Sequence, residues 1–467
     1  MSQPRDSYPQ TSQDNYQDSY QGRQHNGHQD AYTPVPRQGP GGSYRDGIQD
    51  SIRQEPRLLA AGPDAGWARH LDTFGQWEPQ AAGPGLLEVL AESGLTGRGG
   101  AAFETWRKAT ATAGTGRKGL FAARPVVIAN GAEGEPLSFK DRTLLAHAPH
   151  LVIDGLIALA AALGQTGGRT SSQTSAGGTS MYVYAPAASL PRVKQALGER
   201  PGGKKIRVVQ APETFISGES SAVVNMIENG TALPTDQRRR LSESGLNGRP
   251  TLVVNVETLA QVALIARYGA QWFRQAGTAT DPGTRLVSVS GPAPTRDVVL
   301  EVPGGVQLSA VLKEAGMDPG SLSAVLVGGY HGRWVRPADH ALTPAGAPGR
   351  AVRPGAGVIH ALDLQTCGIQ ATARILNYLA GQSARQCGPC MFGLPAMASV
   401  LNRIAGGETN PRLSSELDRL GRLVSGRGAC RHPEGTTGMV SSALEVFAAD
   451  FRAHLSGYCT VPGGVAA

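Results

Sequence analysis

Short apolar segments alternate with helix-forming segments through the first half of the folded part of this chain. Apolar strands are expected at 124–130, 180–186 and 204–212. One helix is expected to start near 141, between the first two strands, and another to cover 191–200, between the last two. Strands that alternate with helices are typical of a parallel sheet, because a parallel connection needs a crossover that is usually helical. The pattern therefore predicts an α/β layer with a parallel sheet.

The periodicity of the sequence changes twice after this layer. A long helical stretch is expected at 253–268, and short strands around one helix then predict a compact β-grasp-like unit. From Ala371 to about His454 the pattern is helical. The predicted division of the chain is a disordered tail at 1–55, an α/β domain at 56–283, a β-grasp domain at 284–362 and a helical domain at 363–467.

Two segments have a composition that disfavours ordered structure. Residues 1–55 are rich in Gln, Ser, Tyr, Asp, Gly and Pro and hold almost no aliphatic residues. Such a segment buries too little apolar surface to offset its conformational entropy, so it is predicted to be disordered. The Gly/Ser/Thr-rich insertion at 165–179 is predicted to be flexible for a similar reason.

The charge pattern and the cysteine count exclude several classes of protein. The net charge is +7, but the only tight basic cluster is Arg238–Arg240, which predicts no nucleic-acid partner. Five cysteines in 467 residues do not form a disulfide scaffold and suit a reducing cytoplasm. The N-terminus lacks a signal-peptide core, and the longest apolar run, 151–163, is too short to span a bilayer. The sequence therefore predicts a cytoplasmic location with no membrane insertion.

Four polar, glycine-bearing loops carry the candidate ligand site. The segment GLTGRGGAAFETWRK at 94–108 gathers glycines ahead of an expected helix, an arrangement that lets backbone N–H groups approach a phosphate. The loop NGAEGEP follows the first strand, and the segments 213–228 and 248–262 place polar residues ahead of two further helices. Taken singly, the first loop is equally a tight turn and the second a solvated acidic turn. Together they can form one concave nucleotide site at the carboxyl ends of the strands.

Three cysteines near the C-terminus predict a second site. Cys387 and Cys390 form a Cys-x2-Cys pair, and Cys430 follows about forty residues later. This spacing is typical of a metal or iron–sulfur centre, although three thiols leave one ligand position open. Cys367 or His432 could supply the fourth ligand, and a zinc-stabilised scaffold stays an alternative.

The four loops, in this order, resemble those of the NADH-binding flavoprotein subunit of respiratory complex I and its relatives in NAD-reducing hydrogenases and formate dehydrogenases. The resemblance covers about 85–455. It implies an α/β FMN-binding domain, a small β-grasp domain of the soluble-ligand-binding type and a C-terminal helical iron–sulfur cluster domain. It also implies FMN, a 4Fe-4S or 3Fe-4S cluster, and NADH as the substrate.

The resemblance assigns roles to residues of this chain. The glycine loop and Lys108 would cradle the flavin, Phe103 would stack on the nicotinamide nucleotide, and Glu135 would orient the hydride donor as the catalytic residue. The implied cofactor-binding residues are Gly97, Arg98, Gly99, Gly100, Phe103, Lys108, Asn130, Glu133, Gly218, Glu219, Asn255 and Thr258. The implied cluster ligands are Cys387, Cys390 and Cys430.

Departures from the family pattern leave two functions open. Ala384 stands where the family has the first cluster cysteine, and Ala132, Ser220 and Val254 replace polar residues of the loops. The first hypothesis is an oxidoreductase that passes electrons from NADH through FMN and the cluster to a ferredoxin-like or other iron–sulfur electron-transfer subunit. The alternative is a non-catalytic or ferredoxin-linked electron-relay homologue that has lost NADH oxidation.

Overall fold

The computed structural model describes residues 56–114, 123–165, 179–236, 239–292, 297–338, 340–344 and 350–461, which all belong to one compact unit. The predicted disordered tail at 1–55 and all but the ends of the predicted flexible insertion lie outside the described residues. Arg238 of the basic cluster lies outside them as well.

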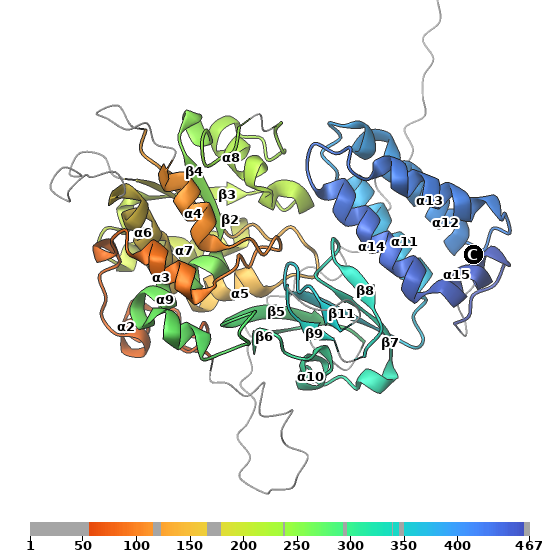
Figure 1. Ribbon diagram of the computed structural model, residues 1–467, viewed down its shortest axis with the longest axis horizontal. Helices are drawn as coiled ribbons and strands as arrows, with labels where there is room; N and C mark the ends of the chain where they lie inside the picture. Colours follow the sequence, from red (N-terminus) through yellow and green to blue (C-terminus); the bar gives the residue numbers. More distant parts are fainter. Residues whose placement is uncertain are drawn as a thin grey trace, which may run out of the picture. The chain divides into compact units, whose positions relative to one another are not determined.

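A parallel sheet of four strands confirms the predicted α/β layer (Figure 1). Its strands are β1 (Val126–Asn130), β2 (Ser180–Pro186), β3 (Ile206–Ala211) and β4 (Thr251–Asn255), in the order β3-β2-β1-β4. The register places Asn130, the last residue of β1, opposite both Tyr184 and Asn255. The carboxyl ends of β1 and β4 therefore lie level at one edge of the sheet, and β2 continues two residues further in the same direction.

Helices cover the sheet because β1, β2 and β4 are mostly apolar and buried on both faces. Val126 and Ile128 of β1 pack in a cluster with Val223 of α8, while α6 and α9 also contact β1. A Cβ at Gly155 of α6 would lie 1.8 Å from the carbonyl oxygen of Leu259 in α9, so only glycine allows these two helices to approach so closely. The helices of this part are α2 (Trp67–Phe74), α3 (Leu86–Ser93), α4 (Thr105–Gly114), α5 (Lys140–His147), α6 (Pro149–Gln165), α7 (Leu190–Glu199), α8 (Ser220–Asn229) and α9 (Val256–Arg274).

The helix predicted at 253–268 lies at Val256–Arg274, so it begins three residues later and ends six residues later than predicted. Residues 253–255 belong to β4, because this apolar stretch pairs in parallel with β1. The helix then starts at Val256, with the Asn255 side chain accepting the N–H of Glu257 as its N-cap. Gly269 has a φ of 86°, and helical structure resumes beyond it as far as Arg274.

A mixed sheet with one helix forms the predicted β-grasp unit. Its strands are β5 (Thr284–Ser290), β6 (Val298–Pro303), β7 (Leu322–Val327), β8 (Arg333–Val335) and β11 (Val358–Asp363), in the order β6-β5-β11-β7-β8. The helix α10 (Leu308–Glu314) places Val311 and Leu312 in a core with Val287 and Ile359. Two short strands, β9 (Ala341–Leu342) and β10 (Ala351–Val352), pair separately.

Helices form the C-terminal part, as the sequence predicts. Figure 1 shows them gathered in one bundle: α11 (Gly368–Gly381), α12 (Leu394–Ala405), α13 (Arg412–Val424), α14 (His432–Val446) and α15 (Ala448–Leu455). Leu376, Leu401 and Met439 are among the residues of their shared core. The domain limits given above stay predictions.

Within the described ranges, no single helix has both the length and the apolar character needed to cross a membrane. The pair α5 and α6, bent by 94°, passes that test only when the two helices are taken together.

Candidate functional site

The glycine loop lies against the start of α9. The N–H of Gly97 donates to the carbonyl oxygen of Phe103 over 2.8 Å and closes the loop on itself. The N–H of Arg98 donates to Oγ1 of Thr258 over 2.8 Å, and a Cβ at Gly99 would lie 3.2 Å from Cβ of Asn255. The loop and the N-terminus of α9 thus bring six of the predicted residues together at the carboxyl edge of the sheet.

The two cations predicted for the flavin contact the protein itself. The Arg98 guanidinium is buried and donates to the carbonyl oxygens of Pro282 and Thr284 over 3.3 and 3.1 Å. Burial, and then the charge of Arg285, lower the pKa of Arg98 to about 10, so the group stays cationic near neutral pH. Nζ of Lys108 donates to the Val253 carbonyl oxygen over 2.6 Å. Arg98 and Lys108 therefore hold the loop in place, and their contact with a cofactor stays a prediction.

The ring of Phe103 lies at the surface. It is 56% exposed, at the end of the same loop where Gly97 closes it. An exposed aromatic face beside a glycine loop is free to stack on a flat ligand.

The loop after β1 packs against the loop after β3. Nδ2 of Asn130 donates to the Gly218 carbonyl oxygen over 2.9 Å, and its Oδ1 accepts the N–H of Ala132. A Cβ at Gly134 would lie only 2.1 Å from the carbonyl oxygen of Thr214, so the two loops can meet only because residue 134 is glycine. Asn130 and Gly218, predicted separately from two motifs, are direct neighbours.

The two acidic residues of the loop after β1 differ in their surroundings. The Glu133 carboxylate accepts the N–H groups of Asp141 and Arg142, each over 3.0 Å, and so caps α5. Glu135 is partly exposed as a residue, and its Oε2 accepts the N–H of Tyr330 over 2.9 Å. Its Oε1 is buried without a hydrogen-bond partner among the described residues. Burial raises the pKa of Glu135 to about 8, so its carboxyl group is mostly neutral at pH 7.

The predicted residue Glu219 caps α8, and its charge affects one group of each candidate site. Its Oε2 accepts the N–H groups of Ser221 and Ala222 over 2.8 and 3.1 Å, and it also accepts the Ser221 hydroxyl. The charge of Glu219 raises the pKa of Lys108, against the larger effect of burial, and adds to the raised pKa of the Cys430 thiol. One carboxylate therefore acts on the glycine-loop side and on the cysteine side.

A buried ionic network at the same edge was not among the predicted site residues. Nζ of Lys140 lies 2.7 Å from Oδ1 of Asp141 and 2.8 Å from Oε2 of Glu257. Nδ2 of Asn255 donates to Asp141, and the N–H of Leu286 in β5 donates to Glu257 over 2.8 Å. Burial alone would lower the pKa of Lys140, but the two carboxylates outweigh it and raise that pKa. A Lys-Asp pair at a helix start is usually exposed, so Lys140 and Asp141 gave no indication of a buried network. The one indication in the sequence was Glu257, which lies two residues after the predicted site residue Asn255.

The three predicted cluster cysteines come together beside Ala384. The thiols of Cys387 and Cys390 are hydrogen bonded, and the N–H groups of Ala429, Ala384 and His432 point at Cys387, Cys390 and Cys430 respectively. Burial, and then the neighbouring Cys387, raise the pKa of Cys390 to about 12. Burial acts in the same direction on Cys387, but the N–H groups outweigh it and lower the pKa of that thiol.

Neither predicted substitute for the missing cysteine is directed at these thiols. Nδ1 of His432 lies 3.1 Å from Nε2 of His331, and its Nε2 lies 2.8 Å from the Leu379 carbonyl oxygen, so both ring nitrogens are engaged. Cys367 lies instead beside His454 at 3.2 Å. Three cysteines therefore form the candidate centre.

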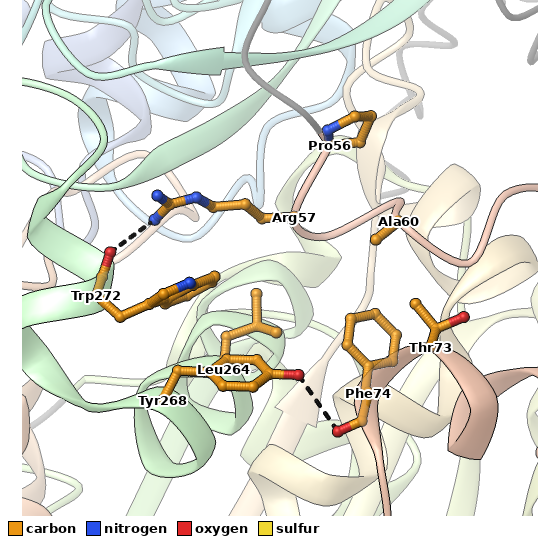
Figure 2. A pocket seen from close by; sticks show the side chains of 8 residues that line it. All are labelled: Pro56, Arg57, Ala60, Thr73, Phe74, Leu264, Tyr268 and Trp272. Carbon is orange, nitrogen blue, oxygen red and sulfur yellow. Dashed lines mark hydrogen bonds between the residues drawn. The ribbon is translucent and has the colours of Figure 1, made fainter.

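A surface pocket lies elsewhere and contains none of the predicted site residues (Figure 2). Arg57 lies over the ring of Trp272 at 4.2 Å and donates to its carbonyl oxygen over 3.1 Å. The lining is Pro56, Arg57, Ala60, Thr73, Phe74, Leu264, Tyr268 and Trp272.

Two family models match the chain over these two sites. The Nuo51 FMN-binding domain matches residues 90–264, and the iron–sulfur binding region of NADH-ubiquinone oxidoreductase F matches residues 370–454. The chain belongs to this flavoprotein family. Its modest identity to known members makes it a divergent one.

Named relatives agree with this assignment. The F 2 subunit of the NADH-quinone oxidoreductase of Rhizobium meliloti is 29% identical over 79% of this chain and 88% of that protein. The NADP-reducing hydrogenase subunit HndC of Solidesulfovibrio fructosivorans is 26% identical over 79% of this chain and 76% of that protein. An NAD+-reducing nickel–iron hydrogenase has a similar structure, with a TM-score of 0.68 and 26% identity. That match covers 81% of this chain but only 63% of the hydrogenase chain.

The residues present fit both cofactors of the family. The glycine loop, Asn255 and Thr258 form a close-packed edge where backbone approaches side chain, and the orphaned Oε1 of Glu135 is buried in the neighbouring loop. The three thiols with their N–H donors fit an iron–sulfur cluster with three cysteine ligands.

Proposed function

We propose that this chain is a flavin- and iron–sulfur-dependent oxidoreductase that takes electrons from NADH and delivers them to an electron-carrier partner. The observation that carries the proposal is that the glycine loop packed on the start of α9 and the three-cysteine group lie in the two segments that match the FMN-binding and iron–sulfur domains. FMN, when bound, supplies the change from two-electron to one-electron chemistry that such a transfer needs.

The protein's own residues bind and orient. The glycine loop, Asn255 and Thr258 would hold the flavin, with Asn130 and Gly218 fixing the facing loop. Phe103 is exposed and would stack on the nicotinamide nucleotide. Glu135, protonated below its raised pKa of about 8, would donate a hydrogen bond toward the donor nucleotide. Cys387, Cys390 and Cys430 would hold the cluster.

The relatives support a role within a larger assembly. Those that match are named as subunits, of a quinone oxidoreductase and of a hydrogenase. We infer that an iron–sulfur protein of ferredoxin type receives the electrons of this chain, in the cytoplasm. The relatives include both an NADH and an NADP protein by name, so the test below compares the two nucleotides.

The relay alternative keeps the flavin and the cluster without nucleotide oxidation. The residues that favour it are Ala132, in the loop after β1, and Ser220, the first residue of α8, because both segments would face the nucleotide. The N–H of Ala132 donates to Oδ1 of Asn130, and its methyl side chain packs against the core of the sheet and offers no polar group.

Anaerobic addition of NADH to purified protein tests both functions. We expect the flavin absorbance to bleach with NADH, and NADPH in a parallel sample measures the preference. A flavin that dithionite reduces but neither nucleotide bleaches would establish the relay instead. Protein that carries no flavin and binds none would overturn both.

A further inference from the structure

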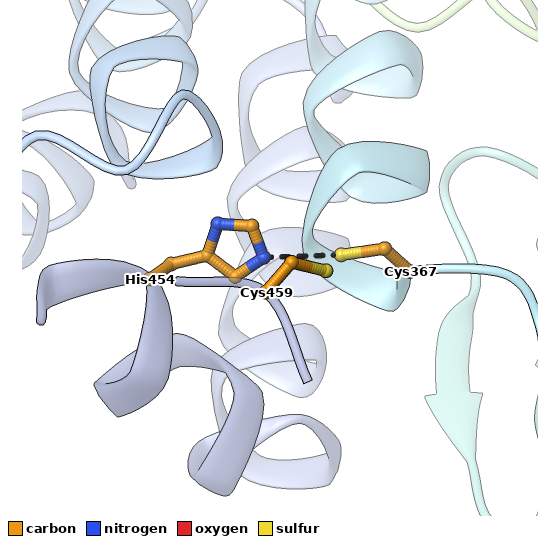
Figure 3. A group of neighbouring side chains, drawn as sticks. All are labelled: Cys367, His454 and Cys459. Atoms are coloured by element: carbon orange, nitrogen blue, oxygen red, sulfur yellow. Dashed lines mark hydrogen bonds between the residues drawn. The ribbon is translucent and has the colours of Figure 1, made fainter. Parts of the chain in front are cut away.

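A second group of side chains that could hold a metal ion lies outside both sites. Cys367, His454 and Cys459 place one ligand atom each within 4.8 Å of one another (Figure 3). Cys367 is the N-cap residue of α11, and His454 lies in the last turn of α15. Cys459 belongs to the segment that follows α15. The group therefore joins three elements at one end of the helical bundle.

The three side chains are shielded from solvent and point at one another. His454 is fully buried and Cys367 is 6% exposed, while Cys459 is partly buried. Nε2 of His454 lies 3.2 Å from Sγ of Cys367. Its Nδ1 is buried without a hydrogen-bond partner among the described residues. The contact with Sγ of Cys367 therefore sets the orientation of the His454 ring. A buried imidazole that has lost its hydrogen bonds to water needs other partners that replace them.

The donor set and its spacing fit zinc. Two thiolates and one imidazole are preferred ligands of this ion, and all three are available because both cysteines are free thiols. Zinc with Zn–S of about 2.3 Å and Zn–N of about 2.0–2.1 Å separates tetrahedral ligand atoms by roughly 3.5–3.8 Å. Ligand atoms that all lie within 4.8 Å reach this spacing by small side-chain movements.

We propose that Cys367, His454 and Cys459 hold a zinc ion. Zinc has no redox chemistry, so the site takes no electrons from the neighbouring centre. Its effect is mechanical, because it fastens the segment after α15 to the start of α11. The proposal does not depend on the flavin chemistry.

Metal analysis of the full-length protein tests the site. We expect roughly one zinc per chain in addition to the cluster iron. Cys459→Ser, at the most exposed ligand, should lower zinc about tenfold or more and leave iron, sulfide and flavin unchanged. Cys390→Ser is the matched control, which should lose iron and keep zinc.

A measurement on the unmodified protein covers the case in which a variant fails to fold. Zinc removal by a chelator should lower the thermal midpoint and increase hydrogen exchange at 457–461, and cobalt(II) added back should give thiolate-to-cobalt charge-transfer absorption. Loss of iron in Cys459→Ser would overturn the proposal, because Cys459 would then serve the cluster. Absence of zinc would overturn it too, whether or not mass spectrometry finds a disulfide between Cys367 and Cys459.

Discussion

The two redox sites of this chain use their side chains in opposite ways. At the carboxyl edge of the parallel sheet, hydrogen bonds to loops and to the N–H groups at helix starts occupy the polar side chains of Arg98, Glu133 and Glu219. At the helical bundle, the thiols of Cys387 and Cys390 receive backbone N–H groups and remain available as ligands. We therefore expect the flavin to contact mainly the backbone of the loops, and the cluster to be bound by cysteine side chains. Substitutions at the first site should therefore act by disturbing the packing that holds the loops. Substitutions at the second site should act by changing the number of cluster ligands.

The largest effect is expected from Lys140→Met, which tests whether buried contacts within the protein support the first site. It leaves the buried carboxylates of Asp141 and Glu257 without their cation. Breaking a buried ion pair on one side costs about 3–5 kcal/mol. Urea denaturation measures the loss, and Lys194→Met, at an exposed position of α7, serves as the control. Equal stability of the two variants would show that the network does not support the fold.

Gly134→Ala probes how closely the two loops must meet. Its Cβ would lie 2.1 Å from the Thr214 carbonyl oxygen, which cannot move as a flexible side chain can. Overpacking of this kind costs about 1–3 kcal/mol, and flavin affinity should fall with it. Gly198→Ala, where a Cβ meets open space, is the matched control for both fluorescence titration and unfolding. Unchanged flavin binding in Gly134→Ala would separate these loops from the cofactor site.

Glu135→Gln tests the buried carboxyl by its pH dependence. The folded pKa is raised to about 8, so the native state holds a proton that the unfolded state has already released. The stabilisation is complete below the ordinary glutamate pKa and is lost as pH rises through about 8. Between these limits the free energy of unfolding should fall by about 1.4 kcal/mol per pH unit more in the native protein than in Glu135→Gln. Parallel pH profiles in the two proteins would contradict the raised pKa.

The smallest effect, on ligand count alone, is expected from Ala384→Cys. The N–H of Ala384 already points at Cys390, so a thiol there lies next to the centre. A fourth cysteine should raise iron retention after mild oxidation without changing flavin content. Ser399→Cys, at an exposed position of α12, adds a thiol without a site. If the new thiol at 384 stays as open to alkylation as that of Ser399→Cys, it is not a ligand.

Local patterns in the sequence predicted strands and helices better than they predicted contacts. The strand at 180–186 agrees with β2 at both ends, because its apolar run is bounded by Gly/Ser residues and by Pro186. The start of α9 was misplaced, since Val253 and Val254 suit a helix as well as a strand until β1 lies beside them. The roles of Glu133 as a cap and of Arg98 as a loop anchor depend on partners 8 to 186 residues away. No spacing rule carries that information.

The position of Glu219 has a consequence for redox measurements. Its single negative charge is felt both at Lys108 and at Cys430. In a poorly solvated region, charge added on one side of such a group is only weakly screened from the other. The midpoint potential of the flavin should therefore depend on the oxidation state of the cluster, and that of the cluster on the oxidation state of the flavin. Replacing Glu219 should shift both midpoint potentials together.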